Sequence, residues 1–257
     1  MFGEDDVGDT TTGLILSQIA QHATEVAAIA SARLSGFGRK NDADQAAVDA
    51  MRRSFQTAPF SGKVVIGEGE IDEAPMLYIG EELGAGGIKT DIAVDPLEGT
   101  KLCASDAPNA MTVVALAPQG GLLHAPDMYM DKLAIGPGYA PGLIDLDLSP
   151  TENVTRLAKA KGVPISEIRA CLLDRPRHEK IIEELRRAGA GIRLIPDGDV
   201  AGVFWTTEAA RSGVDIYFGS GGAPEGVLAA AAIRCVGGQM HARLMPENEQ
   251  EAARARS

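Results

Sequence analysis

The chain has 257 residues, of which 45% are apolar and 23% charged, and its formal net charge is −12 at pH 7. Nucleic acids and anionic membranes bind clustered Lys and Arg, so this acidic balance argues against both as partners. The longest apolar runs fall well short of the ~20 residues that cross a bilayer. The three cysteines follow no metal-binding spacing and no secretory signal is recognised, so we expect a cytoplasmic protein with reduced thiols.

The first half of the chain mixes helical and strand-like patterns. Residues 1–12 are acidic and turn-rich, and we expect them to form a loose tail. The following patterns predict helices over 13–34, 44–56 and 74–83, strands over 64–68 and 88–96, and a mostly antiparallel meander over 111–118, 120–126, 128–135 and 142–148. Residues 13–150 are therefore expected to form one α/β half, which would carry the metal site.

After Pro150, helical and strand-like segments alternate, which is typical of βα units. The patterns predict helices over 152–162, 177–190 and 224–237, and strands over 168–174, 192–199, 214–221 and 238–246. Residues 151–246 are expected to form a smaller, substrate-binding βα half with ligand sites at the strand ends. Residues 247–257 are expected to form a polar tail.

Four acidic motifs stand at predicted strand ends or helix starts. They are GRKNDADQAAVDAM, GEGEIDE, DIAVDPLEGT and GSGGAPEGV, which contain Asp44, Glu68, Asp95 with Glu98, and Glu225. Each has an ordinary structural interpretation, such as a helix N-cap for Asp44, a turn for the DPxxG stretch, or a charge that complements a helix N-terminus for Glu225. Together they predict one site built from distant segments. Carboxylates without a His or Cys pattern suit Mg²⁺ or Mn²⁺.

Within VVIGEGEIDEAP, four carboxylates crowd behind a predicted strand. Glu68 stands directly at the strand end and is the expected metal ligand, because a bound cation would offset the cost of burying it. Glu70, Asp72 and Glu73 are expected to surround the metal ligand without binding the metal, to cap a helix near Pro75, or to form a solvated turn.

These motifs resemble those of the lithium-sensitive, metal-dependent phosphatase superfamily, for which DPLEGT is a signature. KNDADQAAVDAM, VVIGEGEIDEAPMLYIGEELG, DIAVDPLEGT, APDMYMDKL, DRPRH, IPDGDVA and GGAPEGV occur in an order similar to that of class II fructose-1,6-bisphosphatases. IASARLSG, PLEGTKLCA and DRPRH are similar to the branch that also hydrolyses sedoheptulose-1,7-bisphosphate. The resemblance covers residues 13–246. It implies a layered αβαβα sugar-phosphatase fold with a mixed sheet in the first half and a site in the crevice between the halves.

The same resemblance implies two or more Mg²⁺ or Mn²⁺ ions at the site. Asp44 and Glu68 would bind one ion, and the other would be bound by Asp95, Glu98 and Glu225. Thr100 would orient the attacking water and act with Asp95 and Glu98 in catalysis. The substrate-binding residues that the family pattern implies are Glu98, Gly99, Thr100, Tyr129, Arg175, Pro176, Arg177, Asp197, Gly198, Asp199 and Gly222. The arginines suit a distal phosphate, and the aspartates suit sugar hydroxyls.

The sequence departs from the family pattern after ARLMPE, where relatives continue and this chain has ENEQEAARARS. The expected ligands all precede this point, whereas the last sheet and an oligomer interface could lack part of the family's structure. The leading hypothesis is a homo-oligomer, dimer or tetramer, that hydrolyses the 1-phosphate of fructose-1,6-bisphosphate, with sedoheptulose-1,7-bisphosphate as a second substrate. The alternatives are a catalytically silent homologue that binds metal or sugar phosphate or modulates a partner, and an inositol-phosphatase-like enzyme.

Overall fold

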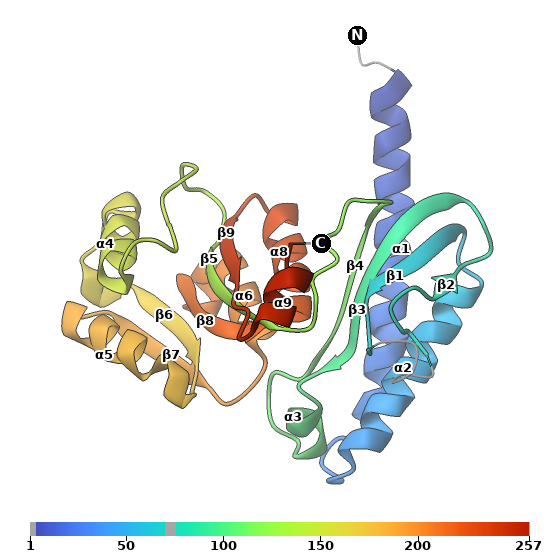
Figure 1. The fold of residues 1–257 in the computed structure, drawn as a ribbon, viewed down its shortest axis with the longest axis horizontal. Helices are drawn as coiled ribbons and strands as arrows, with labels where there is room; N and C mark the ends of the chain where they lie inside the picture. The colour runs from blue at the N-terminus through green and yellow to red at the C-terminus, as the bar shows by residue number, and fades with distance from the viewer. Residues whose placement is uncertain (1–3, 70–75, 257) are drawn as a thin grey trace. The chain divides into compact units, whose positions relative to one another are not determined.

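The computed structural model describes residues 4–69 and 76–256, and the chain divides into two compact units, Met1–His124 and Ala125–Ser257. Each unit contains helices and a mixed sheet (Figure 1), which confirms the predicted α/β fold and the mixed sheet of the first half. The division falls between residues 124 and 125, whereas the sequence pattern changes after Pro150. Among the described residues, every helix is too short or too polar to span a membrane.

Unit 1 is a sheet covered on one face by two long helices (Figure 1). Its elements are α1 (Glu4–Ala32), α2 (Lys40–Gln56), β1 (Phe60–Ile66), β2 (Glu82–Leu83), β3 (Ile88–Glu98), α3 (Thr100–Ala104) and β4 (Met111–Pro118). The strand order is β2-β1-β3-β4, with β1 parallel to β3 and both outer strands antiparallel to their neighbours. Small residues such as Ala23 and Ala27 of α1 and Ala47 of α2 are fully buried, which lets these helices approach the sheet and each other closely.

Two expectations for unit 1 are wrong. The tail expected over residues 1–12 is helical from residue 4 onward, because α1 begins at Glu4. The helix expected over 74–83 is absent from the described residues 76–83, where the backbone turns and pairs back onto the end of β1. The N–H of Gly80 donates to the carbonyl of Val64, and the N–H of Ile79 donates to that of Gly69. The expectations for Glu70, Asp72 and Glu73 fall outside the described residues.

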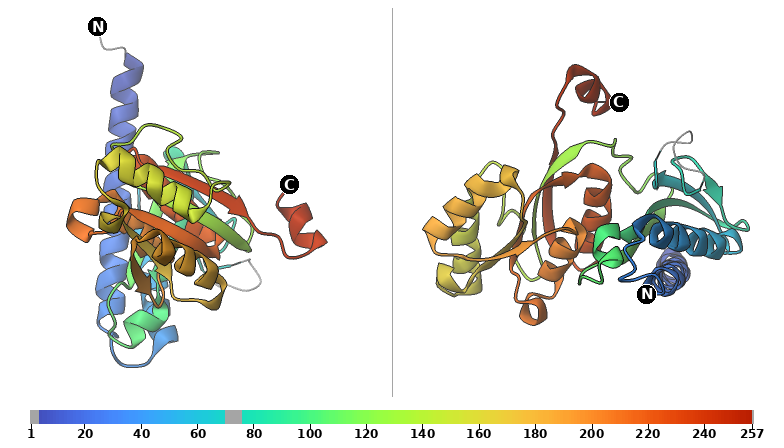
Figure 2. Two further views of the ribbon diagram at one scale, coloured as in Figure 1. Left: turned by 90° about the vertical axis from the view of Figure 1, so that its left-hand side faces the viewer. Right: turned by 90° about the horizontal axis from the view of Figure 1, so that it is seen from below.

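Unit 2 places a sheet between two helical layers, with α4 and α5 on one face and α6 and α8 on the other (Figure 2). Its elements are β5 (Tyr129–Ile135), α4 (Pro150–Lys161), β6 (Arg169–Leu173), α5 (Glu179–Ala188), β7 (Gly191–Ile195), α6 (Asp199–Thr207), α7 (Ala209–Ser212), β8 (Ile216–Gly222), α8 (Ala223–Cys235), β9 (Gln239–Leu244) and α9 (Glu249–Arg254), with 3₁₀ turns at Ile165–Glu167 and Pro176–His178. The strand order is β7-β6-β8-β5-β9, parallel from β7 to β8 and antiparallel beyond. Successive residues of β6 alternate between the faces, so Leu172 packs toward α4 and α5, whereas Cys171 and Leu173 pack toward α6 and α8.

The predicted meander is wrong. Residues 120–126 and 142–148 form no strand, and β4 and β5 belong to different sheets. The second segment is held by a side chain instead of a partner strand. The amide of Asn153, which is buried in α4, accepts from the N–H of Asp145 at 2.9 Å and donates to its carbonyl at 2.9 Å. Side-chain bonds of this kind satisfy a loop backbone without a sheet.

The sequence patterns also missed α6 and the end of the chain. Gly198, with φ of +82°, precedes α6, whose Val200 and Val203 are fully buried. The residues expected as a polar tail contain α9, which Asn248 caps by accepting from the N–H of Glu251 at 2.9 Å.

Candidate active site

In unit 1, the predicted acidic residues gather at one edge of the sheet. Glu68 follows β1 by two residues, and Asp95 and Glu98 lie at the end of β3. Because β1 and β3 are parallel, their carboxyl ends lie at the same edge. Asp44 lies inside α2, which begins at Lys40, so the N-cap interpretation of this residue is wrong. These four residues are called the acidic cluster below.

Burial and mutual repulsion act on the acidic cluster. Burial raises the pKa of Glu68 to about 8, and the nearby negative charges of Asp44 and Asp95 contribute in the same direction. Burial also raises the pKa of Asp44. Glu98 is only 8% exposed, and carboxylate oxygens of Asp95 and Glu98 lie within 4.8 Å of each other. Carboxylates that repel one another in a partly buried site could hold a divalent metal ion, whose charge would reverse the penalty.

The backbone around the acidic cluster is fixed by local bonds. The N–H of Glu68 donates to the carbonyl of Leu77 at 3.0 Å. The register between β3 and β4 shifts between Asp95 and Glu98, and the N–H of Leu97 donates to Oδ1 of Asp95 at 3.1 Å. Gly99 then takes a left-handed conformation with φ of +79°, which turns the chain so that Thr100 opens α3. The predicted residues 98–100 therefore form a tight strand-to-helix turn.

In unit 2, two predicted carboxylates occupy the first turns of α6 and α8. Asp199 is 6% exposed, and its Oδ2 accepts from Nζ of Lys132 at 2.6 Å. The Oε2 atom of Glu225 is buried and has no hydrogen-bond partner among the described residues. Burial raises the pKa of Glu225, the charge of Asp199 raises it further, and Lys132 opposes both effects. An orphaned buried carboxylate oxygen at this position fits the role of a metal ligand.

Consecutive glycines of β8 make room for these carboxylates. A Cβ on Gly221 would lie 2.3 Å from Oδ2 of Asp199, and a Cβ on Gly222 would lie 2.0 Å from Oε2 of Glu225. The glycine pair in GSGGAPEG thus permits close approach of two charged groups to the backbone.

The arginines of DRPRH are held in different ways. Nε of Arg177 donates to the carbonyl and the Oγ of Ser220 at 3.2 and 3.1 Å, and Nη2 donates to the same carbonyl at 2.8 Å. Its guanidinium also lies 5.1 Å from the ring centroid of Tyr129, within the range of a cation–π contact. Arg175 makes only a 3.4 Å contact with Oδ1 of Asp197 and a bond to the carbonyl of Asp174.

Two supporting residues were missed in the sequence analysis. Lys132 lies in APDMYMDKL, and its charge within a predicted strand was the signal that could have found it. His178 lies in the DRPRH stretch and is 1% exposed. Its Nε2 accepts from the N–H of Ser220 at 2.9 Å, so Nδ1 carries the proton and donates to the carbonyl of Leu173 at 2.9 Å. His178 therefore fixes the backbone of Ser220 against Arg177.

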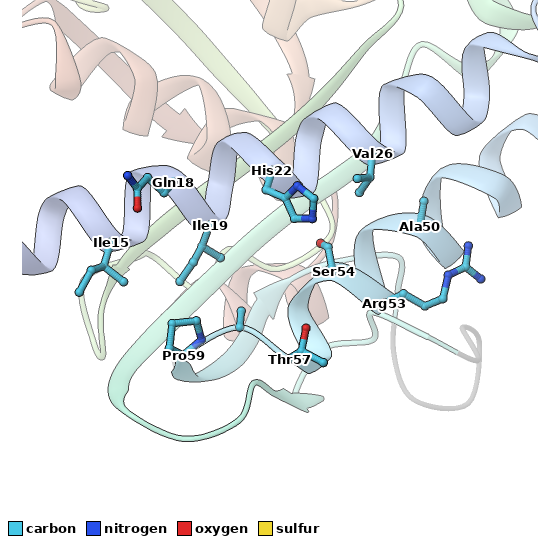
Figure 3. A pocket seen from close by; sticks show the side chains of 11 residues that line it. Ile15, Gln18, Ile19, His22, Val26, Ala50, Arg53, Ser54, Thr57 and Pro59 are labelled. Carbon is cyan, nitrogen blue, oxygen red and sulfur yellow. The ribbon is translucent and has the colours of Figure 1, made fainter.

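A separate hollow of about 630 Å³ lies in unit 1 between α1 and the end of α2. Figure 3 shows His22 of α1 opposite Ser54 of α2, with Ile19 above the turn at Thr57 and Pro59. It contains none of the predicted site residues.

Fold and acidic cluster define a class: an α/β protein with a carboxylate site that could hold a divalent metal ion. A family model described as "Bacterial fructose-1,6-bisphosphatase, glpX-encoded" matches residues 15–257. The chain belongs to this family.

Curated relatives bear the family out. Fructose-1,6-bisphosphatase 1 class 2 of Escherichia coli strain K12 is 49% identical over 227 residues, which cover 88% of this chain and 67% of the relative. D-fructose 1,6-bisphosphatase class 2/sedoheptulose 1,7-bisphosphatase of Synechococcus elongatus is 46% identical over 254 residues, which cover 94% of this chain and 72% of the relative.

Proposed function

We propose that this chain hydrolyses the 1-phosphate of fructose-1,6-bisphosphate and releases inorganic phosphate. Family membership supports the reaction class, and metal dependence is supported by the raised pKa of Glu68, about 8, which results from burial and from the nearby charges of Asp44 and Asp95. The relative named as a bifunctional enzyme supports sedoheptulose-1,7-bisphosphate as a second substrate.

The metal ions are proposed to be Mg²⁺ or Mn²⁺, two or more per site, because the donors are hard carboxylate oxygens. Asp44 and Glu68 would hold one ion, and the ligands of the other would be Asp95, Glu98 and Glu225. Bound divalent ions would polarise the phosphoryl oxygens, lower the pKa of water and stabilise the leaving alkoxide.

Residues of the chain would orient the reactants. The hydroxyl of Thr100, which follows the turn at Gly99 and begins α3, would hydrogen-bond the attacking water. Arg177, held by Ser220 and Tyr129, would present its remaining N–H groups to the distal phosphate. The further proposed substrate contacts are the stretches 175–177 and 197–199, together with Gly222.

The test is phosphate release from fructose-1,6-bisphosphate with Mg²⁺ or Mn²⁺, comparing wild type with Glu225→Ala. We expect the variant to lose at least about a hundredfold in activity, because a charged ligand is worth several kcal/mol in the transition state. Glu208→Ala is the control, since Glu208 is an exposed glutamate of the same unit. Unchanged activity in Glu225→Ala would contradict the assigned site.

Wild-type protein that binds the bisphosphate but never turns over with any divalent ion would instead support a silent homologue.

We also propose that the protein is a cytoplasmic homo-oligomer, and light scattering of the purified protein tests the oligomeric state.

A further inference from the structure

Lys132 is a buried lysine in an inner strand of the sheet of unit 2. It lies in β5 between β8 and β9, opposite Gly219 and Ala242, and is 1% exposed. Its Nζ lies 2.6 Å from Oδ2 of Asp199. Removing both charges from water is costly, and apolar replacements of buried ion pairs are often as stable. Stability therefore does not explain why a lysine occupies this position.

The surroundings of Lys132 contain two buried carboxylates. Asp199 and Lys132 both act electrostatically on Glu225, so the three groups form one charge cluster within unit 2. The ammonium group pairs with Asp199, whereas Oε2 of Glu225 has no hydrogen-bond partner among the described residues. A Cβ on Gly221 would lie 2.3 Å from the Asp199 oxygen and 3.3 Å from Nζ, so the backbone closes tightly over the pair.

We propose that Lys132 is a positioning residue that withholds Asp199 from the metal ions and keeps it oriented for a hydroxyl of the sugar. The pair consumes one Asp199 oxygen as a hydrogen-bond acceptor and neutralises its charge, while Glu225 keeps an oxygen available for a cation. Asp199 is thus assigned to the sugar and Glu225 to the metal ion. The identity of the sugar rests on the proposed function, but the assignment can be tested without turnover.

Mn²⁺ binding tests the proposal without activity. Calorimetric titration should show Mn²⁺ binding to Lys132→Met about tenfold tighter than to wild type, because removing the ammonium leaves two adjacent carboxylates without a cation. Adding Asp199→Asn to Lys132→Met should abolish this gain. Unchanged Mn²⁺ affinity in Lys132→Met would overturn the proposal.

Fructose 6-phosphate, added to metal-free protein, tests the sugar half of the proposal. Its affinity should fall about tenfold in Lys132→Met, because a charged hydrogen bond no longer orients Asp199. The affinity should recover in part in Lys132→Arg, which restores a charged donor. Equal affinity in Lys132→Met and wild type would overturn the positioning role. If the Met variant does not fold, Asp199→Asn alone removes the negative charge of the same pair and should show the same loss of sugar affinity.

Lys161 supplies a matched control. Its Nζ lies 2.6 Å from Oδ1 of Asp215, which is 5% exposed. Neither residue is among the predicted site residues. Lys161→Met should lower thermal stability without altering Mn²⁺ or fructose 6-phosphate affinity. Equal changes in both lysine variants would show a purely structural effect and overturn the proposal. Wild type that fails to release phosphate yet shows these Mn²⁺ differences would contradict only the proposed function.

Discussion

Two groups of carboxylates, the acidic cluster of unit 1 and the buried aspartates of unit 2, differ in how their negative charge is compensated. At the acidic cluster of unit 1, no ion pair to Asp44 or Glu68 occurs within the described part of the chain, and burial raises both of their pKa values. In unit 2, the buried Asp199 and Asp215 each pair with a lysine at 2.6 Å. The difference indicates that the two groups of carboxylates have different functions. Under the proposed function, a bound metal ion would compensate Asp44 and Glu68, whereas lysines of the chain already compensate Asp199 and Asp215.

The largest test of this contrast removes a carboxylate from unit 1. Glu68→Gln should lower phosphate release with Mg²⁺ or Mn²⁺ by at least about a hundredfold, because the amide keeps the shape of the ligand but not its charge. Glu82→Gln, at an exposed glutamate of β2, is the control in steady-state kinetics. Activity of Glu68→Gln within twofold of wild type would remove the acidic cluster from the mechanism.

Adding a single methyl group at Gly221 or Gly222 can distinguish the roles of Asp199 and Glu225 in unit 2. Gly222→Ala should displace Glu225 and weaken Mn²⁺ binding tens of fold, and Gly221→Ala should displace Asp199 and weaken fructose 6-phosphate binding, since the added Cβ would lie 2.0 and 2.3 Å from the respective oxygens. Calorimetry measures both affinities. Gly191→Ala is the control, because its Cβ would meet no atom within 3.4 Å. The contrast fails if both variants lose the same ligand.

The arginines of unit 2 should differ in importance. Arg177→Ala is expected to raise KM for the bisphosphate about tenfold with little change in kcat, because its guanidinium is already held by Ser220 and Tyr129. Arg175→Ala should have a smaller effect, since its 3.4 Å contact with Asp197 orients it weakly. Steady-state kinetics at saturating metal compare the two variants, and a larger KM change for Arg175→Ala would reverse this ranking.

The smallest expected effect is on stability in the absence of metal. The folded-state pKa of Glu68, about 8, lies above its ordinary value of 4.5, so the folded state binds the proton more tightly than the unfolded state. The free energy of unfolding should therefore fall as pH rises from about 4.5 to about 8, by at most a few kcal/mol, and stay level above that range. Urea denaturation of metal-free wild type should show a steeper fall than Glu68→Gln. Parallel curves for the two proteins would show that Glu68 is not buried among like charges.

The sequence predicted most elements because their apolar periods are local. The strands β3, β6 and β8 and the helices α4, α5 and α8 lie where the patterns placed them. Two of the errors occur where local pattern and tertiary bonds conflict. Residues 142–148 alternate like a strand, yet the amide of Asn153 holds their backbone in a loop. Residues 76–83 read as a helix, yet they pair back onto β1.

For the candidate site, the sequence by itself determined which side chains are present and, through the order of its motifs, the family to which they belong. It could place Glu68 at a strand end but could not show that Asp44, on a helix, acts on its charge. Only the tertiary structure decided which carboxylates receive a protein cation, because Lys132 and Asp199 are separated by 67 residues and meet through the packing of β5 against α6. Charge is a property of each residue, whereas its compensation depends on distance and burial, and the fold sets both.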